Sequence, residues 1–363
     1  MKKLKNQIRA SLTSCIKKII YILGAILYFT KLYKLVIFLR RNTMKILLYH
    51  EIANHKNPFT DGTNITVNID AFKKQMLFLS RHYKVVNLDT IVNRIENNQM
   101  ARNYVAITFD DAYRSFIGNA LPTLSNLGFH TTIFLIGRCI KDGKFMWRNV
   151  LVYIINQYPE RAKASIYNLV KEADGVFSKS VLNSSRKELI KRSEDIARFL
   201  RPADLLTFIR NIERQFEIPK IGLYLTTEDC EKLPNSDVHF GNHSYSHWNF
   251  QHLSINDIEK ETRPWHFNGL HKVQYKHNYF AFPFGIPLKN SKKIEEIARY
   301  NNIKCLFFAN GRDNDINTPL FRLGRHHLSS SQEHQIFTEM ELFPAFRKLR
   351  DRFSWFSKYR RLN

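Results

Sequence analysis

The chain has 363 residues and 44% of them are apolar, enough to bury a large core, so it is not an intrinsically disordered protein. This length suits an α/β barrel with an insertion. Its 56 basic and 32 acidic side chains give a net charge of +24, which favours an anionic partner such as nucleic acid, an acidic polymer or a membrane surface. No nucleic-acid-binding motif accompanies this charge, and we expect no nucleic-acid partner.

Residues 1–43 form a basic and apolar leader with ten Lys or Arg side chains and no acidic one. Its apolar run, Ile19–Phe29, is too short to span a bilayer. Extending the run to Leu39 reaches spanning length but includes Lys31 and Lys34. We therefore predict a membrane-associated helix that lies in the interface of an anionic membrane, with its lysines reaching toward lipid phosphates. A transmembrane anchor is the second interpretation, and a helix packed in the protein core is the third.

Two other interpretations of the leader lack the residues that they need. A cleaved signal peptide requires small residues after the apolar run, and a lipoprotein site at Cys15 requires an apolar segment before it. The remaining cysteines, Cys139, Cys230 and Cys305, share no short spacing with Cys15 or with one another. The sequence therefore indicates no disulfide framework, and it does not indicate on which side of the membrane the chain lies.

Strands and helices alternate from residue 44 to about 140. A buried strand at 46–49 ends at His50 and Glu51, and a helix over 70–82 has Asp70 as its expected N-cap. Further strands are expected at 83–88, 104–109 and 130–137, and further helices at 88–96 and 116–128. This alternation predicts an α/β fold with a mainly parallel sheet.

The alternation stops between about 141 and 220, where the chain is helical and charged. A capping box at Ser185–Glu188 and a helix after Pro202 indicate a helical insertion. Alternation then returns over 238–247, 279–285, 292–301, 304–310 and 320–328. Residues 336–363 form a basic tail with interleaved aromatic side chains, which are Phe346, Phe353, Trp355 and Phe356. We expect this tail, like the leader, to suit an anionic membrane surface.

Two pairs of residues at predicted strand ends could carry metal chemistry. His243 and His247, four residues apart, can direct both imidazoles at one divalent cation, although in a chain with 14 histidines a surface or core role is commoner for such a pair. Asp110 and Asp111 follow the strand at 104–109, and in a parallel barrel the carboxyl ends of the strands surround the active site. One carboxylate can bind a cation while the other faces a water. A helix N-cap would explain one Asp but not two.

Two further features lie at strand ends. Pro283 and Gly285 in the "FAFPFG" stretch shape a loop whose backbone N–H groups, for example near Phe284, could face an oxyanion. His50 follows the strand at 46–49. Taken alone, the first feature is a turn and the second is more often a structural histidine.

Together these pieces resemble the polysaccharide deacetylase family with NodB homology, carbohydrate esterase family four. The stretch "TFDDAYRSFIGNALPTLSNLGFHTTIFLIG" is similar to the first motif of that family, and "HFGNHSYSH" is similar to its metal-binding motif. "YHEI", about sixty residues before "TFDD", resembles the permuted branch that contains the poly-N-acetylglucosamine deacetylases. The resemblance covers roughly 44–140 and 221–330. It implies a distorted (β/α) barrel over 44–335, interrupted by the insertion at about 141–220.

The resemblance also implies a role for each matching residue. Asp111, His243 and His247 would bind a divalent metal, usually zinc. Asp110 would be the general base, and His50 would be the general acid by similarity to the permuted branch.

One position departs from the typical family. Arg usually stands two residues before the proline, where this chain has Ala281. If the permuted pattern did not apply, His326 or His327 would supply the acid.

The function expected from this resemblance is metal-dependent removal of an N-acetyl group from a sugar. The substrate would be a surface polysaccharide, a lipopolysaccharide or a lipid-linked glycan precursor. An O-acetyl esterase acting on a glycan is an alternative, because the same site can cleave esters. A non-catalytic, membrane-attached glycan-binding protein is another, although the intact Asp110, Asp111, His243 and His247 argue against a decayed site.

Overall fold

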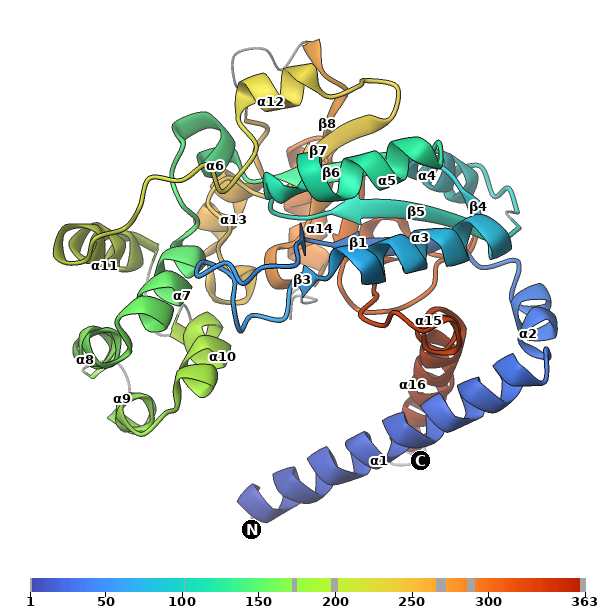
Figure 1. The fold of residues 1–363 in the computed structure, drawn as a ribbon, viewed down its shortest axis with the longest axis horizontal. Helices are drawn as coiled ribbons and strands as arrows, with labels where there is room; N and C mark the ends of the chain where they lie inside the picture. The colour runs from blue at the N-terminus through green and yellow to red at the C-terminus, as the bar shows by residue number, and fades with distance from the viewer. Residues whose placement is uncertain are drawn as a thin grey trace.

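The computed structural model describes residues 2–100, 102–171, 175–196, 202–265, 272–285 and 291–359. At its centre is a parallel sheet in the order β10-β9-β8-β7-β6-β5-β1-β11, with β4 paired to the first residues of β5 (Figure 1). Its strands are β1 (Lys45–Tyr49), β4 (Lys84–Val85), β5 (Tyr104–Phe109), β6 (Thr131–Leu135), β7 (Val238–Asn242), β8 (Tyr275–Ala281), β9 (Cys305–Phe308), β10 (Leu323–Gly324) and β11 (His326–His327). Two short strands, β2 (Glu51–Ile52) and β3 (Thr66–Val67), pair separately.

The sheet closes on itself through one segment of the chain. Strand β10 pairs with β9, and β11 pairs with β1 at the other edge of the sheet. Only Arg325 separates β10 from β11, so residues 323–327 join both edges. Strands buried on both faces favour such a closed parallel sheet, and all six residues of β5 are buried. The predicted distorted (β/α) barrel is confirmed.

Helices cover the outside of the barrel. They are α3 (Ile69–His82), α4 (Leu88–Glu96), the π-helical η1 (Phe116–Ala120), α5 (Leu121–Asn126), α12 (Thr227–Lys232), α13 (Ile255–Thr262) and α14 (Ser291–Tyr300). The expected N-cap of α3 was wrong. Asn68 caps the helix, because its side-chain oxygen accepts from the N–H groups of Asp70 and Ala71. Asp70 instead lies in the first turn, where its charge favours the helix dipole.

The predicted insertion is a helical unit beside the barrel. It contains α7 (Trp147–Gln157), α8 (Pro159–Val170), α9 (Gly175–Leu182), α10 (Arg186–Ile196) and α11 (Pro202–Gln215), and α6 (Gly137–Asp142) precedes it. The capping box before α10 is confirmed, since the Ser185 N–H donates to Glu188 and the Glu188 N–H donates to the Ser185 hydroxyl. Every residue from Trp147 to Ile155 of α7 is buried, so α7 is the central helix of the insertion.

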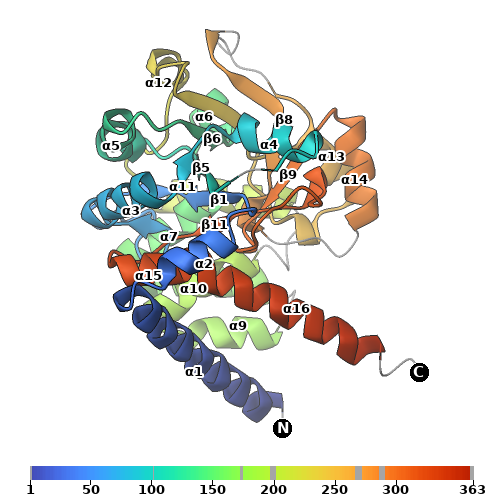
Figure 2. The same cartoon turned by 90° about the vertical axis from the view of Figure 1, so that its right-hand side faces the viewer.

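The leader forms two helices, α1 (Lys2–Phe29) and α2 (Tyr33–Leu39), which lie against the C-terminal helices (Figure 2). These are α15 (Glu333–Phe337), the π-helical η6 (Thr338–Leu342) and α16 (Phe343–Tyr359). Among the described residues, no single helix is long and apolar enough to cross a membrane. Ser14–Phe29 and Tyr33–Leu39 pass that test only as a pair, bent by 104°. Of the tail's aromatic residues, Phe353, Trp355 and Phe356 have side chains outside the described part of the structure.

Candidate active site and metal centre

The carboxyl ends of three strands bring the predicted site residues together. Asp110 and Asp111 follow β5, His243 follows β7 and His50 follows β1. Backbone hydrogen bonds extend the barrel past these strand ends: the Asp110 N–H donates to the Tyr49 carbonyl at 2.8 Å and the His243 N–H to the Leu135 carbonyl at 2.9 Å. The backbone of the sheet therefore fixes where these side chains begin.

Asp111, His243 and His247 form a buried group whose potential ligand atoms all lie within 4.8 Å of one another. Asp111 Oδ1 is 3.2 Å from His247 Nε2 and 3.4 Å from His243 Nε2. Within the described residues, however, no N–H is aligned to donate to that oxygen. The side chains of Asp111, His243 and His247 thus converge, as the sequence predicted.

The hydrogen bonding of His243 indicates which of its ring nitrogens could bind a cation. His243 Nδ1 lies 2.8 Å from the Ala281 carbonyl oxygen, and because a carbonyl only accepts, Nδ1 carries the proton. Nε2 then presents its lone pair toward the Asp111 carboxylate. Metal-binding histidines are commonly held in this way through their other ring nitrogen. The donor set of one carboxylate and two imidazoles therefore fits a divalent cation.

Left-handed backbone conformations direct these side chains. Asp111 and Ala112 have φ of 66° and 56°, and His247 has φ of 58°. Such conformations are unfavourable for residues other than glycine and cluster at functional sites. The turn at Asp111 sends the two adjacent carboxylates in different directions, Asp111 to the histidines and Asp110 to Arg325.

Arg325 is a site residue that the sequence analysis missed. Its guanidinium makes a bidentate pair with Asp110, with Nη1–Oδ1 at 2.6 Å and Nη2–Oδ2 at 2.7 Å, and both side chains are buried. Burial raises the pKa of Asp110, but Arg325, together with His243 and His50, outweighs burial and holds this pKa below its usual value. Arg325 thus keeps Asp110 ionised. It lies between β10 and β11, whereas the typical family has its Arg at the position that Ala281 occupies here.

The three candidate acids lie in different surroundings. Burial lowers the pKa of His50 to about 4, although the neighbouring Asp111 and Asp110 raise it, and its Nδ1 is buried without a partner in the described structure. The His327 ring centroid is 6.4 Å from that of His50, and its Nδ1 faces the Leu48 carbonyl. His326 instead lies 3.0 Å from Asp313, so it is not part of this group.

The predicted substrate loop adjoins the metal-binding group. Residues Pro283–Gly285 form the short helix η4, and the Phe284 ring centroid is 4.9 Å from that of His247. Gly285 has φ of 60°, and a β-carbon there would overlap Ala309, so glycine is required. Its N–H already donates to the Phe282 carbonyl. An oxyanion donor in this loop stays a prediction.

The insertion also reaches this site through the start of α7. The Trp147 Nε1–H donates to the His247 carbonyl at 3.0 Å, and the Trp147 ring stacks on that of Trp248. Arg148 pairs with Glu194 at 2.6 Å, with its guanidinium 5.7 Å from the centre of the Phe284 ring. Trp147, Arg148, Trp248 and Glu194 were not predicted from the sequence as site residues.

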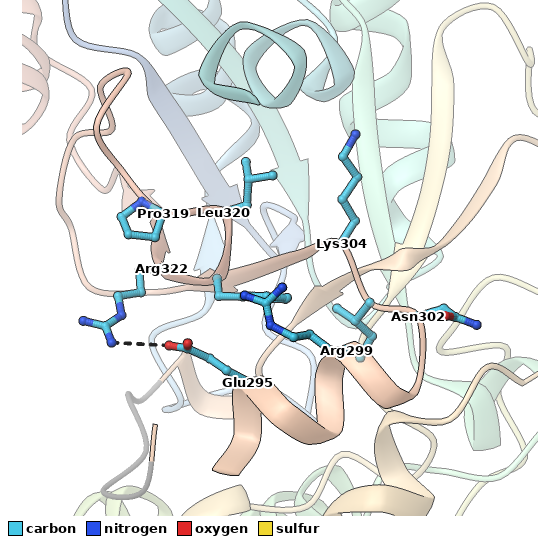
Figure 3. Close-up of a pocket in the computed structure, with 9 residues that line it drawn as sticks. Glu295, Arg299, Asn302, Lys304, Pro319, Leu320 and Arg322 are labelled. Atoms are coloured by element: carbon cyan, nitrogen blue, oxygen red, sulfur yellow. Dashed lines mark hydrogen bonds and ion pairs between the residues drawn. The ribbon is translucent and has the colours of Figure 1, made fainter. Parts of the chain in front are cut away.

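A surface pocket of about 770 Å³ lies elsewhere, between α14 and η5 (Leu320–Arg322) (Figure 3). Of the charged side chains that line it, Arg322 pairs with Glu295 and Lys304 with Glu96. None of the predicted site residues lines this pocket.

One part of the chain matches a known protein family. Residues 97–174 match the family model described as polysaccharide deacetylase, and this match includes Asp110 and Asp111. Over these residues the chain is similar to polysaccharide deacetylases. The resemblance seen in the sequence is therefore confirmed, and so is the predicted enzyme class, a carbohydrate deacetylase. Among curated proteins, no sequence matches this deacetylase.

A solved structure shares the fold of this chain. The Streptococcus pyogenes deacetylase PplD, solved with acetate, is 15% identical, with a TM-score of 0.55 over 83% of this chain and 99% of that chain. BC0361, a polysaccharide deacetylase from Bacillus cereus, is 12% identical, with a TM-score of 0.49 over 83% and 69% of the two chains. A de-N-acetylase from Aggregatibacter actinomycetemcomitans is also 12% identical, with a TM-score of 0.48 over 80% and 96%.

Proposed function

We propose that this deacetylase is a metal-dependent hydrolase that removes an N-acetyl group from a sugar of a surface polysaccharide, a lipopolysaccharide or a lipid-linked glycan precursor. One observation carries the proposal. The buried Asp111–His243–His247 group lies beside a second carboxylate that is held ionised, with Asp110 Oδ2 3.6 Å from His243 Nε2. A cation site next to an ionised carboxylate that can act as a base suits the hydrolysis of an unreactive amide.

Asp111, His243 and His247 would hold the cation, and two imidazoles with one carboxylate suit zinc. When bound, such a cation acidifies a water and stabilises negative charge on oxygen. Three protein ligands also leave a position open to solvent or substrate, as catalytic sites of this kind require.

The remaining roles belong to side chains of this chain. Asp110 accepts the proton of the attacking water, and Arg325 keeps Asp110 ionised for that task. His50 donates a proton to the departing amine. Burial keeps the His50 ring neutral near pH 7, so it must first take up a proton from solvent. Negative charge that develops beside the ring raises its pKa and favours this uptake, and the imidazolium then passes the proton to the amine nitrogen. A backbone N–H of the Phe284 loop would stabilise the oxyanion.

The test measures acetate release from N-acetylated oligosaccharides and from lipid-linked N-acetylhexosamine, with mass spectrometry of the products. We expect Asp110→Asn to lose turnover by about a thousandfold with its metal retained, and chelator to inactivate the wild type. Full activity of Asp110→Asn, or of the chelated enzyme, would rule the proposal out. Release from O-acetylated but not N-acetylated substrates would favour the esterase.

A further inference from the structure

Helix α1 has two faces with different surroundings, and its inner face is attached to the barrel. Ile20 is buried, and Gly24 lies so close to η6 that a β-carbon there would overlap the Thr338 side chain. The Tyr21 hydroxyl donates to Glu339 at 3.1 Å, and the Tyr28 hydroxyl donates to Glu333. These contacts hold α1 against α15 and η6 over more than two turns.

The outer face of α1 is apolar and exposed, and we name it the apolar stripe. The stripe consists of Leu12, Ile16, Ile19, Ile22, Leu23, Ile26 and Phe29 on α1, continued by Leu32, Leu35, Phe38 and Leu39 at α2. The exposed fractions are 57% for Ile19, 61% for Ile22 and 73% for Phe29. Residues spaced three and four apart face the same side of a helix, so the stripe residues of α1 form one continuous surface. Apolar surfaces of this extent mark interaction sites.

The charge around the apolar stripe identifies its partner. Lys17, Lys18, Lys31 and Lys34 are exposed on the same two helices or the turn between them. The leader carries no acidic residue, so two copies facing each other would repel. An exposed apolar stripe with lysines and no acidic residue on the same helices is typical of helices that lie in the interface of an anionic bilayer.

The attachment of both helices decides how the stripe meets a membrane. Helix α2 is bent away from α1 by 104°, and Arg40 just after it pairs with Asp313 and Glu341. A spanning arrangement would have to break these pairs and the contacts at Gly24. In both views α1 lies along the lower edge of the molecule, so one side of this helix faces away from the barrel (Figures 1 and 2).

We propose that the apolar stripe inserts into one leaflet of an anionic phospholipid bilayer, with α1 lying in the membrane plane while it stays packed on the barrel. The catalytic barrel is then held at a fixed orientation to the lipid surface and does not move freely on a tether. This inference does not depend on the proposed deacetylation, because lipid binding is measured without a glycan.

The test is co-sedimentation of the full chain with vesicles of phosphatidylcholine alone or mixed with phosphatidylglycerol. The stripe variant Ile19→Gln/Ile22→Gln/Ile26→Gln removes three exposed apolar side chains and should weaken binding to the mixed vesicles about a hundredfold or more. Its matched control is Leu182→Gln/Ile221→Gln, which changes two apolar side chains of similar exposure, 47% and 45%, away from the leader. The control should bind like the wild type, and both variants should keep the wild-type circular dichroism and thermal midpoint.

Three outcomes would overturn the proposal. The first is equal vesicle binding by the wild type and the stripe variant, or no binding by either. The second is a wild-type dimer in solution that the stripe variant disperses, which would make a second copy the partner. The third outcome concerns the depth of α1 in the bilayer. Bimane is attached at Leu12→Cys, Ile19→Cys or Ile26→Cys, each in a Cys15→Ser background, and its quenching by brominated lipids should give the same shallow depth at all three positions. Depths that cross the bilayer centre along α1 would show a transmembrane span instead.

Discussion

Two groups of buried charges in this protein look alike in composition and differ in how the charges are paired. The first lies near the start of β1, where Asp313 and Glu341 meet Arg40 and Lys45. Lys45 Nζ is 3.2 Å from Asp313 and 3.3 Å from Glu341, and Arg40 contacts both carboxylates. Two carboxylates are matched by two fixed cations. This group is complete as it stands, and it joins the leader to the barrel.

The second group, at the strand ends, has two carboxylates and one fixed cation. Arg325 bonds both oxygens of Asp110 and leaves Asp111 to the two histidines. A buried carboxylate without a compensating charge is costly, and this imbalance favours the cation that we propose beside Asp111. Burial and acidity alone therefore do not distinguish a site from a structural ion-pair group. The distinguishing feature is a buried carboxylate that has no fixed cation of its own.

The largest effect should follow from removing the unmatched carboxylate. Asp111→Asn is expected to lower kcat/KM for deacetylation by about a thousandfold or more, because it removes a ligand of the expected cation. Acetate release measures this directly. Asp313→Asn is the control from the matched group, and it should keep wild-type activity per folded molecule. Similar losses in both variants would remove the distinction between the two groups.

The matched group should instead control stability. Burial raises the pKa of the Asp313 carboxyl, but Lys45, His326 and Arg40 outweigh burial and hold it well below its usual value. A lowered folded-state pKa contributes stability above pH about 4, and this contribution is lost as the pH falls through the folded-state pKa. Asp313→Asn should therefore lower the free energy of unfolding by about 3–5 kcal/mol at pH 7. Urea unfolding at several pH values should show this difference shrinking below pH 4, and a constant difference would contradict the pairing.

Arg325 tests whether the single fixed cation serves Asp110. Arg325→Gln should lower kcat/KM by about a hundredfold, because Asp110 loses the charge that keeps it ionised and positioned. Arg325→Lys keeps the charge without the bidentate geometry and should recover part of the activity. Steady-state kinetics of the two variants, with metal content as the control, measure this. Activity of Arg325→Gln equal to that of the wild type would show that Asp110 needs no partner.

The smallest effect is expected at the contact between the insertion and the strand-end group. Trp147→Phe keeps the aromatic ring but removes the donor to the His247 carbonyl, at a cost of about 1 kcal/mol. We expect weaker metal affinity, up to about tenfold, with little change in kcat at saturating metal. Metal titrations of the two proteins make the comparison. An unchanged affinity would show that α7 only covers the site.

The sequence could predict the strand-end group because its members follow local patterns. Asp110, Asp111 and His243 each lie just after a recognisable buried strand, His247 follows four residues after His243, and strand ends meet at one edge of a parallel barrel. Arg325 was out of reach, since its partner Asp110 is 215 positions away and their contact depends on how β10 and β11 close the barrel. Trp147 was missed because a tryptophan in an apolar helix looks like an ordinary core residue.

The leader shows the same limit. Its apolar run predicted a helix, and its lysines predicted an interfacial one. Which face packs on the barrel depends on Gly24 meeting Thr338, two residues with no pattern that links them in the sequence. Periodicity therefore gives the element, whereas the distribution of buried and exposed faces requires the tertiary structure.

Metal content is the most direct test of the claim that the unmatched carboxylate marks a cation site. Wild type, Asp111→Asn and Asp313→Asn would be equilibrated with zinc, dialysed and analysed by inductively coupled plasma mass spectrometry. We predict one zinc ion per chain in the wild type and in Asp313→Asn, and none in Asp111→Asn. Equal zinc in all three proteins, or none in the wild type, would contradict the claim.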